Sequence, residues 1–434
     1  MSLIRGSILV VCAALSWNIL SLMFKPKLPP IVEGHFHPKF RRVAEIFRNK
    51  IENGKEGGAA FALYYKGELL IDLWGGYADE DSVQPWDNNT LTLVFSLTKS
   101  MAAITAAKMV EKGWLDYSKP VSAYWPEFKV NNKDNITVEM LLSHQAGLLN
   151  PAANFNSLQD ILLNKEELQK QVAEATPEWP AGTKHGYHML SFALMVDTLL
   201  QKADIKHRNI GQIFKEEIAD EFEIDFFIGL PNEENYRVAK STFLSTPHSL
   251  LAVLLSFDIN YIKYYMSVLF NPTSHTASAF KGPKEVTELR ERQNNPVIRA
   301  IPFTSSNGYS SAKALAKIFG ILASGGTYQG KQLLSKDSIE KLNANMVEGL
   351  DATLLVNTSF GRGFMRLKNS QGDTVYGHTG YGGQVAFADM NNQFGFSYVT
   401  NYPSFYLLND DPRFKDLEKA TYLCFENYIA SQKT

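Results

Sequence analysis

The sequence predicts an α/β (α+β) fold with a mixed sheet, an inserted all-α domain and an N-terminal transmembrane helix. Strand and helix patterns alternate near both ends of the 434-residue chain, whereas the pattern between residues 116 and 300 is mainly helical. Residues 6–24 carry no charge. Because strand patterns occur at both ends, we expect one sheet domain built from both ends of the chain, with helices inserted between them.

The uncharged segment is the first predicted element. Its 19 residues, 6–24, would span roughly 28 Å as a helix, which is close to the hydrocarbon thickness of a bilayer. We therefore predict a single-pass membrane anchor over residues 6–24, followed by a short stiff spacer that ends at residue 30. A cleaved signal peptide is the main alternative, because the apolar stretch 8–15 ends near the small residues Ala14 and Ser16. An organelle presequence is a third reading.

The side of the membrane stays open. Basic residues are more numerous after the segment than before it, which favours a cytoplasmic body. Three N-x-S/T sequons, at Asn88, Asn135 and Asn357, have a meaning only for a lumenal or extracellular body, and the expectation leans to that side.

A helix and a hairpin are expected after the spacer. Apolar residues repeat on one stripe over residues 38–54, which indicates an amphipathic helix. Residues 58–65 and 68–79 have strand composition and enclose a glycine turn, so they predict two paired strands. Residues 89–95 then lead directly into a long helix that begins near Ser96.

Helical patterns dominate the middle of the chain, where Pro and Gly separate them. The expected middle helices cover residues 157–175, 189–203 and 210–222. Beyond residue 300 the pattern returns to strands between two helices. The expected helices there cover residues 311–324 and 415–430, and the expected strands cover 353–359, 361–368 and 384–401.

Composition excludes several function classes. With 43 Lys and Arg against 45 Asp and Glu, the net charge is only −2, so no preference for nucleic acid is expected. The two cysteines, Cys12 and Cys424, cannot build a disulfide framework or a Cys-rich zinc site. His35 and His37 form an H-x-H pair, but no further ligand follows at metal-binding spacing. The sequence therefore predicts no cofactor and no metal, and it leaves the oligomeric state open.

The first chemical motif is Ser96-Leu97-Thr98-Lys99, where a strand pattern meets a helix. Residues i and i+3 of a helix lie about 5–6 Å apart on one face, so the Lys99 amine can approach the Ser96 hydroxyl. Desolvation would lower the pKa of Lys99 toward that of a useful base, and the helix N-terminus would favour a developing oxyanion. The motif alone is weak, because a capping serine followed by an exposed lysine gives the same pattern.

Two further motifs fit the same chemistry. Tyr187 follows a Pro- and Gly-rich loop and precedes an apolar helix, where its phenol can shuttle protons. His378, Thr379 and Gly380 precede a glycine pair and a strand. Glycine lets a strand approach a ligand, and the N–H of Tyr381 can complete an oxyanion hole with that of the serine. A packed aromatic and a simple hairpin are the structural alternatives.

The order and spacing of these motifs resemble those of the serine beta-lactamase and D-amino-acid peptidase superfamily, in particular its class C-like esterase branch. An S-x-x-K motif comes early, a tyrosine follows about ninety residues later, and H-T-G lies near the C-terminus. Residues 72–79, DLWGGYAD, and 141–148, LLSHQAGL, are similar to further stretches of the family. The resemblance covers residues 38–430.

The resemblance implies an antiparallel sheet, a helical domain and a site in the cleft between them. It also implies an acyl-enzyme mechanism in which Ser96 attacks an ester, amide or lactam carbonyl. Lys99 and Tyr187 would share the proton transfers, and which of the two is the base is left open. The strand implied to line the substrate comprises His378, Thr379 and Gly380.

Two departures from the family pattern bear on the substrate. The tyrosine motif usually continues Tyr-x-Asn or Tyr-x-Ser, but here Met189 stands at the third position. The group that would bind a substrate carbonyl is therefore missing, which disfavours efficient hydrolysis of beta-lactams or peptidoglycan peptides. His378 stands where many beta-lactamases carry a lysine, and a histidine is largely neutral near pH 7. That exchange fits a less charged ester or amide.

These observations predict a membrane-anchored serine hydrolase, of esterase or peptidase type, for a small-molecule ester or amide. The expected units are an anchor with spacer at residues 1–30 and a hydrolase domain at 31–434. The domain would divide into an α/β lobe at about 31–115 and 301–434 and a helical lobe at about 116–300. A non-catalytic scaffold that keeps the fold is the alternative, because the substrate-specific signature is missing.

A rival nucleophile motif is weaker. Residues 308–312, GYSSA, nearly match G-x-S-x-G, but they end in Ala and follow no clear buried strand. Ser310 is instead expected to cap the next helix.

Overall fold

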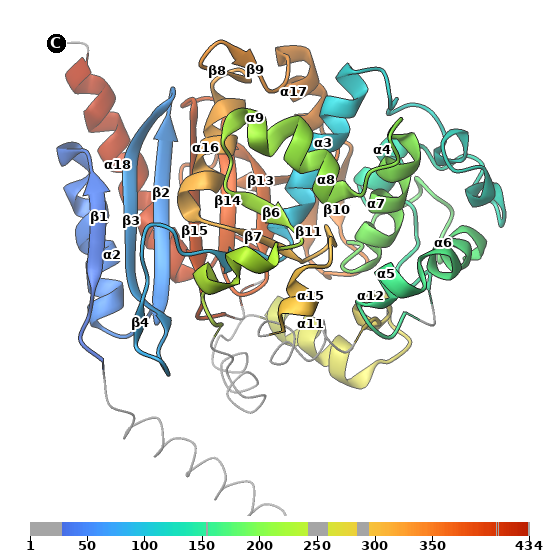
Figure 1. Ribbon diagram of the computed structural model, residues 1–434, viewed down its shortest axis with the longest axis horizontal. Coiled ribbons are helices and arrows are strands. Elements are labelled where there is room, and N and C mark those ends of the chain that lie inside the picture. The colour runs from blue at the N-terminus through green and yellow to red at the C-terminus, as the bar shows by residue number, and fades with distance from the viewer. Residues whose placement is uncertain are drawn as a thin grey trace, which may run out of the picture.

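The protein is described by a computed structural model that covers residues 28–152, 155–241, 259–283, 295–404, 406 and 408–432. Its centre is an antiparallel sheet, whose strands lie side by side across Figure 1. The strands lie in the order β1 (Val32–Phe36), β3 (Glu68–Asp79), β2 (Gly58–Tyr65), β15 (Phe394–Thr400), β14 (Gln384–Asp389), β13 (Thr374–Gly380), β12 (Met365–Lys368), β11 (Asn357–Phe360) and β10 (Val347–Leu350), with β4 (Gln84–Pro85) beside β3. Pairing of β2 with β15 joins the two ends of the chain. The α/β fold with an antiparallel sheet is confirmed.

The sheet is covered on both faces, which explains why β2 is apolar throughout. Alternate residues of β2 point to opposite faces: Phe61 and Leu63 enter one core, whereas Ala60 and Ala62 enter the other. The first core lies under α2 (Arg41–Glu52) and α18 (Pro412–Gln432). The second lies under α3 (Leu97–Glu111) and α16 (Ala312–Ala323), as Figure 1 shows. The small alanines of β2 let α16 approach the sheet closely.

Close approach also requires glycine at one point of β15. A Cβ on Gly395 would lie 2.1 Å from the backbone nitrogen of Gly320 in α16, so no larger residue fits without moving the helix. The β2–β3 hairpin turns at Lys66 and Gly67, which both have positive φ, as a two-residue turn of this kind demands. The predicted hairpin and the helices at 311–324 and 415–430 are therefore present.

Short helices fill the region between residues 116 and 300. They are α4 (Val138–Leu142), α5 (Asp160–Leu163), α6 (Lys165–Glu174), α7 (Ser191–Ala203), α8 (Ile210–Phe214), α9 (Asp220–Phe222), α11 (Ile259–Phe270), α12 (His275–Phe280) and α15 (Pro296–Arg299). This region is not all-α, because β6 (Phe226–Ile228) pairs with β7 (Gly308–Ser310), which also pairs with β5 (Thr92–Leu93). The predicted limits of the two lobes stay a prediction.

Several expected elements differ in detail. The helix expected over 157–175 is interrupted at Asn164, and the one over 210–222 contains a π-helical turn, Lys215–Ala219. The strand expected from residue 353 begins only at β11, because the preceding residues form a turn around Asp351. Ser310 belongs to β7, and Ser311 is the residue whose side chain caps α16 by accepting from the Ala314 N–H.

The predicted membrane anchor needs a correction. No helix in the described part of the chain is both long enough and apolar enough to span a bilayer. This finding contradicts the predicted single-pass membrane localisation, and we do not retain it. The segment at residues 6–24, on which the prediction rested, lies outside the described residues.

Candidate active site

Ser96 stands at the turn between β5 and α3. Phe95 before it has φ +48°, a left-handed conformation that is uncommon for a side chain of this size. The turn is held from β7, because the Val94 N–H donates to the Gly308 carbonyl and the Gly308 N–H donates to the Thr98 hydroxyl, both at 2.9 Å. Ser96 is the N-cap residue of α3, but its side chain does not cap the helix. Instead, the Ser96 hydroxyl donates to the Ser305 carbonyl oxygen at 3.3 Å.

Lys99 lies one turn further along α3 and is completely buried. Its Nζ lies 3.2 Å from Ser96 Oγ, 3.0 Å from the Met189 carbonyl oxygen and 2.9 Å from the Ser305 carbonyl oxygen. The two carbonyls can only accept, so they take the two N–H bonds of a neutral amine. For the lone pair of that amine to take the serine proton, the Ser96 hydroxyl must turn from the Ser305 carbonyl toward Nζ.

Burial favours the neutral form of the Lys99 amine. Loss of solvent lowers the pKa of Lys99 well below its usual value, and the Asp197 carboxylate opposes this effect only partly. Among the described residues no carboxylate pairs with the amine directly, and its three hydrogen-bond neighbours are a hydroxyl and two carbonyls. Lys99 is therefore suited to act as a general base.

Tyr187 is positioned by its backbone. The Tyr187 N–H donates to both oxygens of Asp351 at 3.1 Å, and the N–H groups of Thr353 and Leu354 donate to the same carboxylate at 2.8 Å. This places the Tyr187 ring 4.8 Å from Lys99 Nζ. The loop before α7 is thereby tied to the turn before β11.

The Tyr187 hydroxyl is buried and has no hydrogen-bond partner among the described residues. Burial raises the pKa of Tyr187 above its usual value, although the Ser96 hydroxyl lies near enough to lower it in part. The phenol is thus held protonated beside the serine. A substrate oxygen would give it the missing partner.

His378 enters the site from β13. It is fully buried, and its Nδ1 lies 2.6 Å from the Thr379 carbonyl, so Nδ1 carries the proton. Burial lowers the pKa of His378 to about 3, which makes the imidazole neutral. Its Nε2 is an acceptor without a partner among the described residues. The ring lies 5.8 Å from that of Tyr187.

The other predicted residues of this strand and the turn after it, Thr379, Gly380 and Tyr381, have different surroundings. A Cβ on Gly380 would lie 2.3 Å from the Val94 carbonyl, so glycine is needed where β13 meets the segment before the serine. The Thr379 hydroxyl donates to the Met365 sulfur. Tyr381 is 42% exposed and packs its ring on Phe95.

A histidine pair beside the site was not assigned chemistry from the sequence. His188 Nε2 accepts from the Leu148 N–H, so the proton of His188 sits on Nδ1 and is donated to His144 Nδ1 at 3.2 Å. His144 packs against Tyr187 with ring centroids 4.8 Å apart. Burial lowers the pKa of both histidines. His144 lies in the stretch LLSHQAGL, which was the available signal.

Sequence reasoning also missed Asp351 and Ser305, which hold Tyr187 and Lys99. An isolated acid and a backbone carbonyl carry no motif, so nothing in the sequence marks them. Among the described residues no group of three or more His, Cys, Asp or Glu side chains could hold a metal ion.

Comparison with known proteins identifies the family that this geometry fits. The beta-lactamase family matches residues 43–417. The chain belongs to the beta-lactamase family. The esterase/beta-lactamase LipL of Mycobacterium tuberculosis is 27% identical over 372 residues, which are 85% of this chain and 83% of that protein.

Solved structures of this family agree. A family VIII carboxylesterase is 30% identical, with a TM-score of 0.77 over 91% of this chain and 100% of that one. A penicillin-binding protein homologue from Caulobacter crescentus is 31% identical, with a TM-score of 0.75 and the same coverage. These relatives support a serine hydrolase-like function for the chain, and they match the esterase branch expected from the motifs.

Proposed function

We propose that the protein hydrolyses a small ester or amide through an acyl-enzyme formed on Ser96. The observation that carries the proposal is the buried Lys99 amine, which lies 3.2 Å from Ser96 Oγ while two carbonyls occupy its N–H bonds. An unpaired, desolvated lysine in that position can remove the proton of the serine.

In the first half-reaction Lys99 takes the hydroxyl proton as Ser96 Oγ bonds to the substrate carbonyl carbon. The carbonyl oxygen becomes an oxyanion, and the N–H groups of Ser96 and Tyr381 would donate to it. Tyr187 then donates its phenol proton to the leaving alkoxide or amine, and Lys99 returns a proton to Tyr187. The C–O or C–N bond breaks and the acyl group stays on Ser96.

In the second half-reaction water takes the place of the leaving group. The neutral Lys99, with Tyr187, removes a proton from the water, whose oxygen attacks the acyl carbon. Collapse of this intermediate returns the proton to Ser96 Oγ and releases the carboxylic acid. Lys99 is assigned as the base because burial lowers its pKa, whereas burial raises that of Tyr187.

The substrate class follows from His378, Thr379 and Gly380, which we assign to the strand that lines the substrate. A buried, neutral His378 offers an acceptor nitrogen and no positive charge. An ester or amide with a neutral acyl group therefore suits the site better than a substrate with a carboxylate. Among the relatives, the esterase names agree with this choice.

Labelling with a fluorophosphonate tests the nucleophile. The wild type should be labelled and Ser96→Ala should not, because the probe reacts with an activated serine. Ser100→Ala is the matched control, since Ser100 is a buried serine on the same helix whose hydroxyl has no partner among the described residues. Labelling of Ser96→Ala, or none of the wild type, would exclude the proposal. The alternative of a non-catalytic scaffold is not favoured by the relatives.

A further inference from the structure

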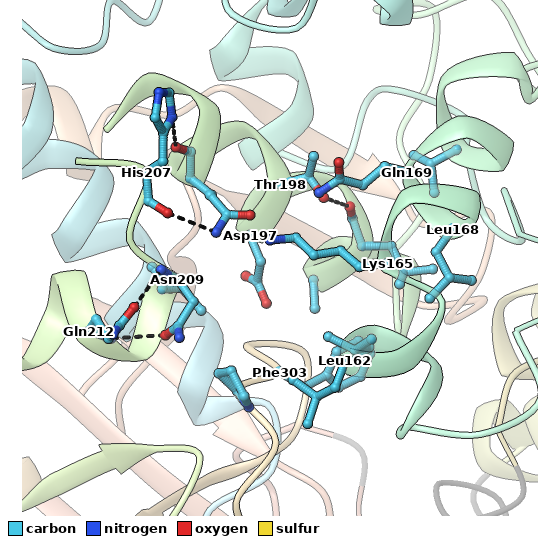
Figure 2. Close-up of a pocket in the computed structure, with 17 residues that line it drawn as sticks. Leu162, Lys165, Leu168, Gln169, Asp197, Thr198, His207, Asn209, Gln212 and Phe303 are labelled. Atoms are coloured by element: carbon cyan, nitrogen blue, oxygen red, sulfur yellow. Dashed lines mark hydrogen bonds between the residues drawn. The ribbon is translucent and has the colours of Figure 1, made fainter. Parts of the chain in front are cut away.

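A cavity lies in the helical part of the molecule (Figure 2), and Ser96 is not among the residues that line it. Its volume is about 230 Å³, and α5, α6, α7 and α8 enclose it together with the segment at Pro302 and Phe303. The walls are largely apolar, with Leu162, Leu168 and Leu194 among them. Ordinary small-molecule sites measure roughly 300–1,000 Å³, so this cavity suits a compound of fragment size.

Asp197 gives the cavity a charged anchor. Among the described residues that line it, Asp197 is the only acid. Its carboxylate accepts from the N–H and the hydroxyl of Thr304, which are both neutral groups. The residue is half-buried, and loss of solvent around the carboxyl raises the pKa of Asp197 to about 7. Both hydrogen-bond partners are neutral, so no cation among the described residues bonds to the carboxylate directly, although the Lys99 charge acts on it.

Several other polar groups of the walls are already hydrogen-bonded. Asn209 and Gln212 form a capping box, and the Thr198 hydroxyl donates to the Leu194 carbonyl. The exposed Lys165 points toward Asp197 in Figure 2 but forms no hydrogen bond with it there. Asp197 is the acidic group of the lining with which a ligand cation can pair.

We propose that this cavity binds a small primary amine with an apolar body, whose ammonium group pairs with Asp197. The ammonium supplies a positive partner for the half-buried carboxylate, and the apolar walls take the body of the ligand. Thr304, the partner of Asp197, is followed directly by Ser305, whose carbonyl accepts from Lys99.

The cavity is therefore linked to the catalytic lysine. The negative charge of Asp197 raises the pKa of Lys99, against the effect of burial. A bound ammonium cancels this charge, so the pKa of Lys99 falls further and more of the amine is neutral. This coupling rests on the proposed function, whereas binding of the amine does not.

Calorimetric titration with benzylamine, about one pH unit above the Asp197 pKa of about 7, tests the binding. The wild type should bind benzylamine at least roughly tenfold more tightly than benzyl alcohol, and Asp197→Asn should lose that preference. Leu162→Trp should abolish binding by filling the cavity from its rim. Leu163→Trp is the matched control, because Leu163 is exposed on the same helix and does not line the cavity. Equal affinity of the wild type and Leu162→Trp, or of amine and alcohol, would overturn the proposal.

Hydrolysis of a neutral ester tests the coupling. Saturating benzylamine should move the acid limb of the pH–rate profile to lower pH in the wild type and in Leu163→Trp, but not in Leu162→Trp. A rate increase that persists in Leu162→Trp and is accompanied by an N-benzyl amide product would show that the amine acts only as an acyl acceptor, which overturns the coupling. Binding of benzylamine without fluorophosphonate labelling would refute the proposed function and leave the cavity proposal intact.

Discussion

At the scale of single residues, Lys99 is fully buried, yet its hydrogen-bond partners among the described residues include no acid. A lysine is rarely buried without an acidic partner, because desolvation of its charge is costly. Here the two neighbouring carbonyls and a hydroxyl satisfy a neutral amine instead. Burial thereby keeps more of the amine neutral, and so able to accept a proton, at the pH where the site would work.

Replacement of Lys99 by methionine separates this chemistry from stability. Lys99→Met should lower kcat/KM for a neutral ester by roughly 10²–10⁴-fold, the size of a lost general base. Two carbonyls lose a donor, but the free-energy cost of holding a buried lysine uncharged disappears as well, so the melting temperature should change little. Ester hydrolysis and thermal unfolding measure the two effects.

Lys133→Met is the matched control for that experiment. Lys133 is also buried, and burial lowers its pKa to about 8, yet its amine donates to the Ala175 carbonyl far from Ser96. Its replacement should leave kcat/KM unchanged. Full activity of Lys99→Met would show that another group removes the serine proton.

At the scale of elements, the site depends on contacts between segments that are distant in sequence. The helix α3 presents the serine and lysine, the loop before α7 presents the tyrosine, and β13 closes the other side. The turn before β11 joins the loop before α7 to the sheet, because Asp351 accepts from the backbone N–H of Tyr187. Asp351 is therefore a positioning residue.

Asp351→Asn tests this role. An amide accepts at one oxygen only and cannot serve all of the N–H groups that converge there, so the unfolding free energy should fall by roughly 2–3 kcal/mol. Displacement of Tyr187 should also lower kcat by about 10–100-fold. Enzyme kinetics and urea unfolding of the same preparation provide both values.

Asp389→Asn distinguishes positioning from a general loss of stability. Asp389 is equally buried and accepts from the Asn392 N–H and the Tyr422 hydroxyl at the far end of β14. It should lose comparable stability and keep kcat. Equal loss of kcat in both variants would refute a specific role for Asp351.

At the scale of the whole molecule, buried histidines couple folding to pH. His144, His188 and His378 are all buried, and burial lowers the pKa of each. For His188 the pKa falls from 6.5 to about 3. Between these two pH values His188 is protonated in the unfolded chain and neutral in the folded chain. The contribution of this residue to stability is therefore lost as the pH falls from 6.5 toward 3.

His188→Gln tests the linkage as a difference. Below the unfolded pKa of 6.5, the unfolding free energy of the wild type minus that of the variant should fall by about 1.4 kcal/mol per pH unit, one proton's worth. Urea unfolding at several pH values measures it. The difference cancels buried acids such as Asp197, whose raised pKa acts in the opposite direction. A pH-independent difference would mean that His188 titrates normally in the folded protein.

The sequence by itself determined the periodic features of this protein. The stripe on α2, the β2–β3 hairpin and the helix that begins at Ser96 follow from local pattern, and an i, i+3 spacing suffices to bring Lys99 to the serine. The order of S-x-x-K, tyrosine and H-T-G pointed to the family that the comparisons establish.

Tertiary structure decided what depends on residues without a local pattern. Whether Lys99 is charged, which tautomer His378 adopts, and what holds Tyr187 all depend on groups such as Ser305 and Asp351, which lie far away in the sequence. Burial and hydrogen bonding are properties of the packed molecule, and they set the pKa values. Local pattern therefore predicted which groups react, and packing determines their protonation and their hydrogen bonds.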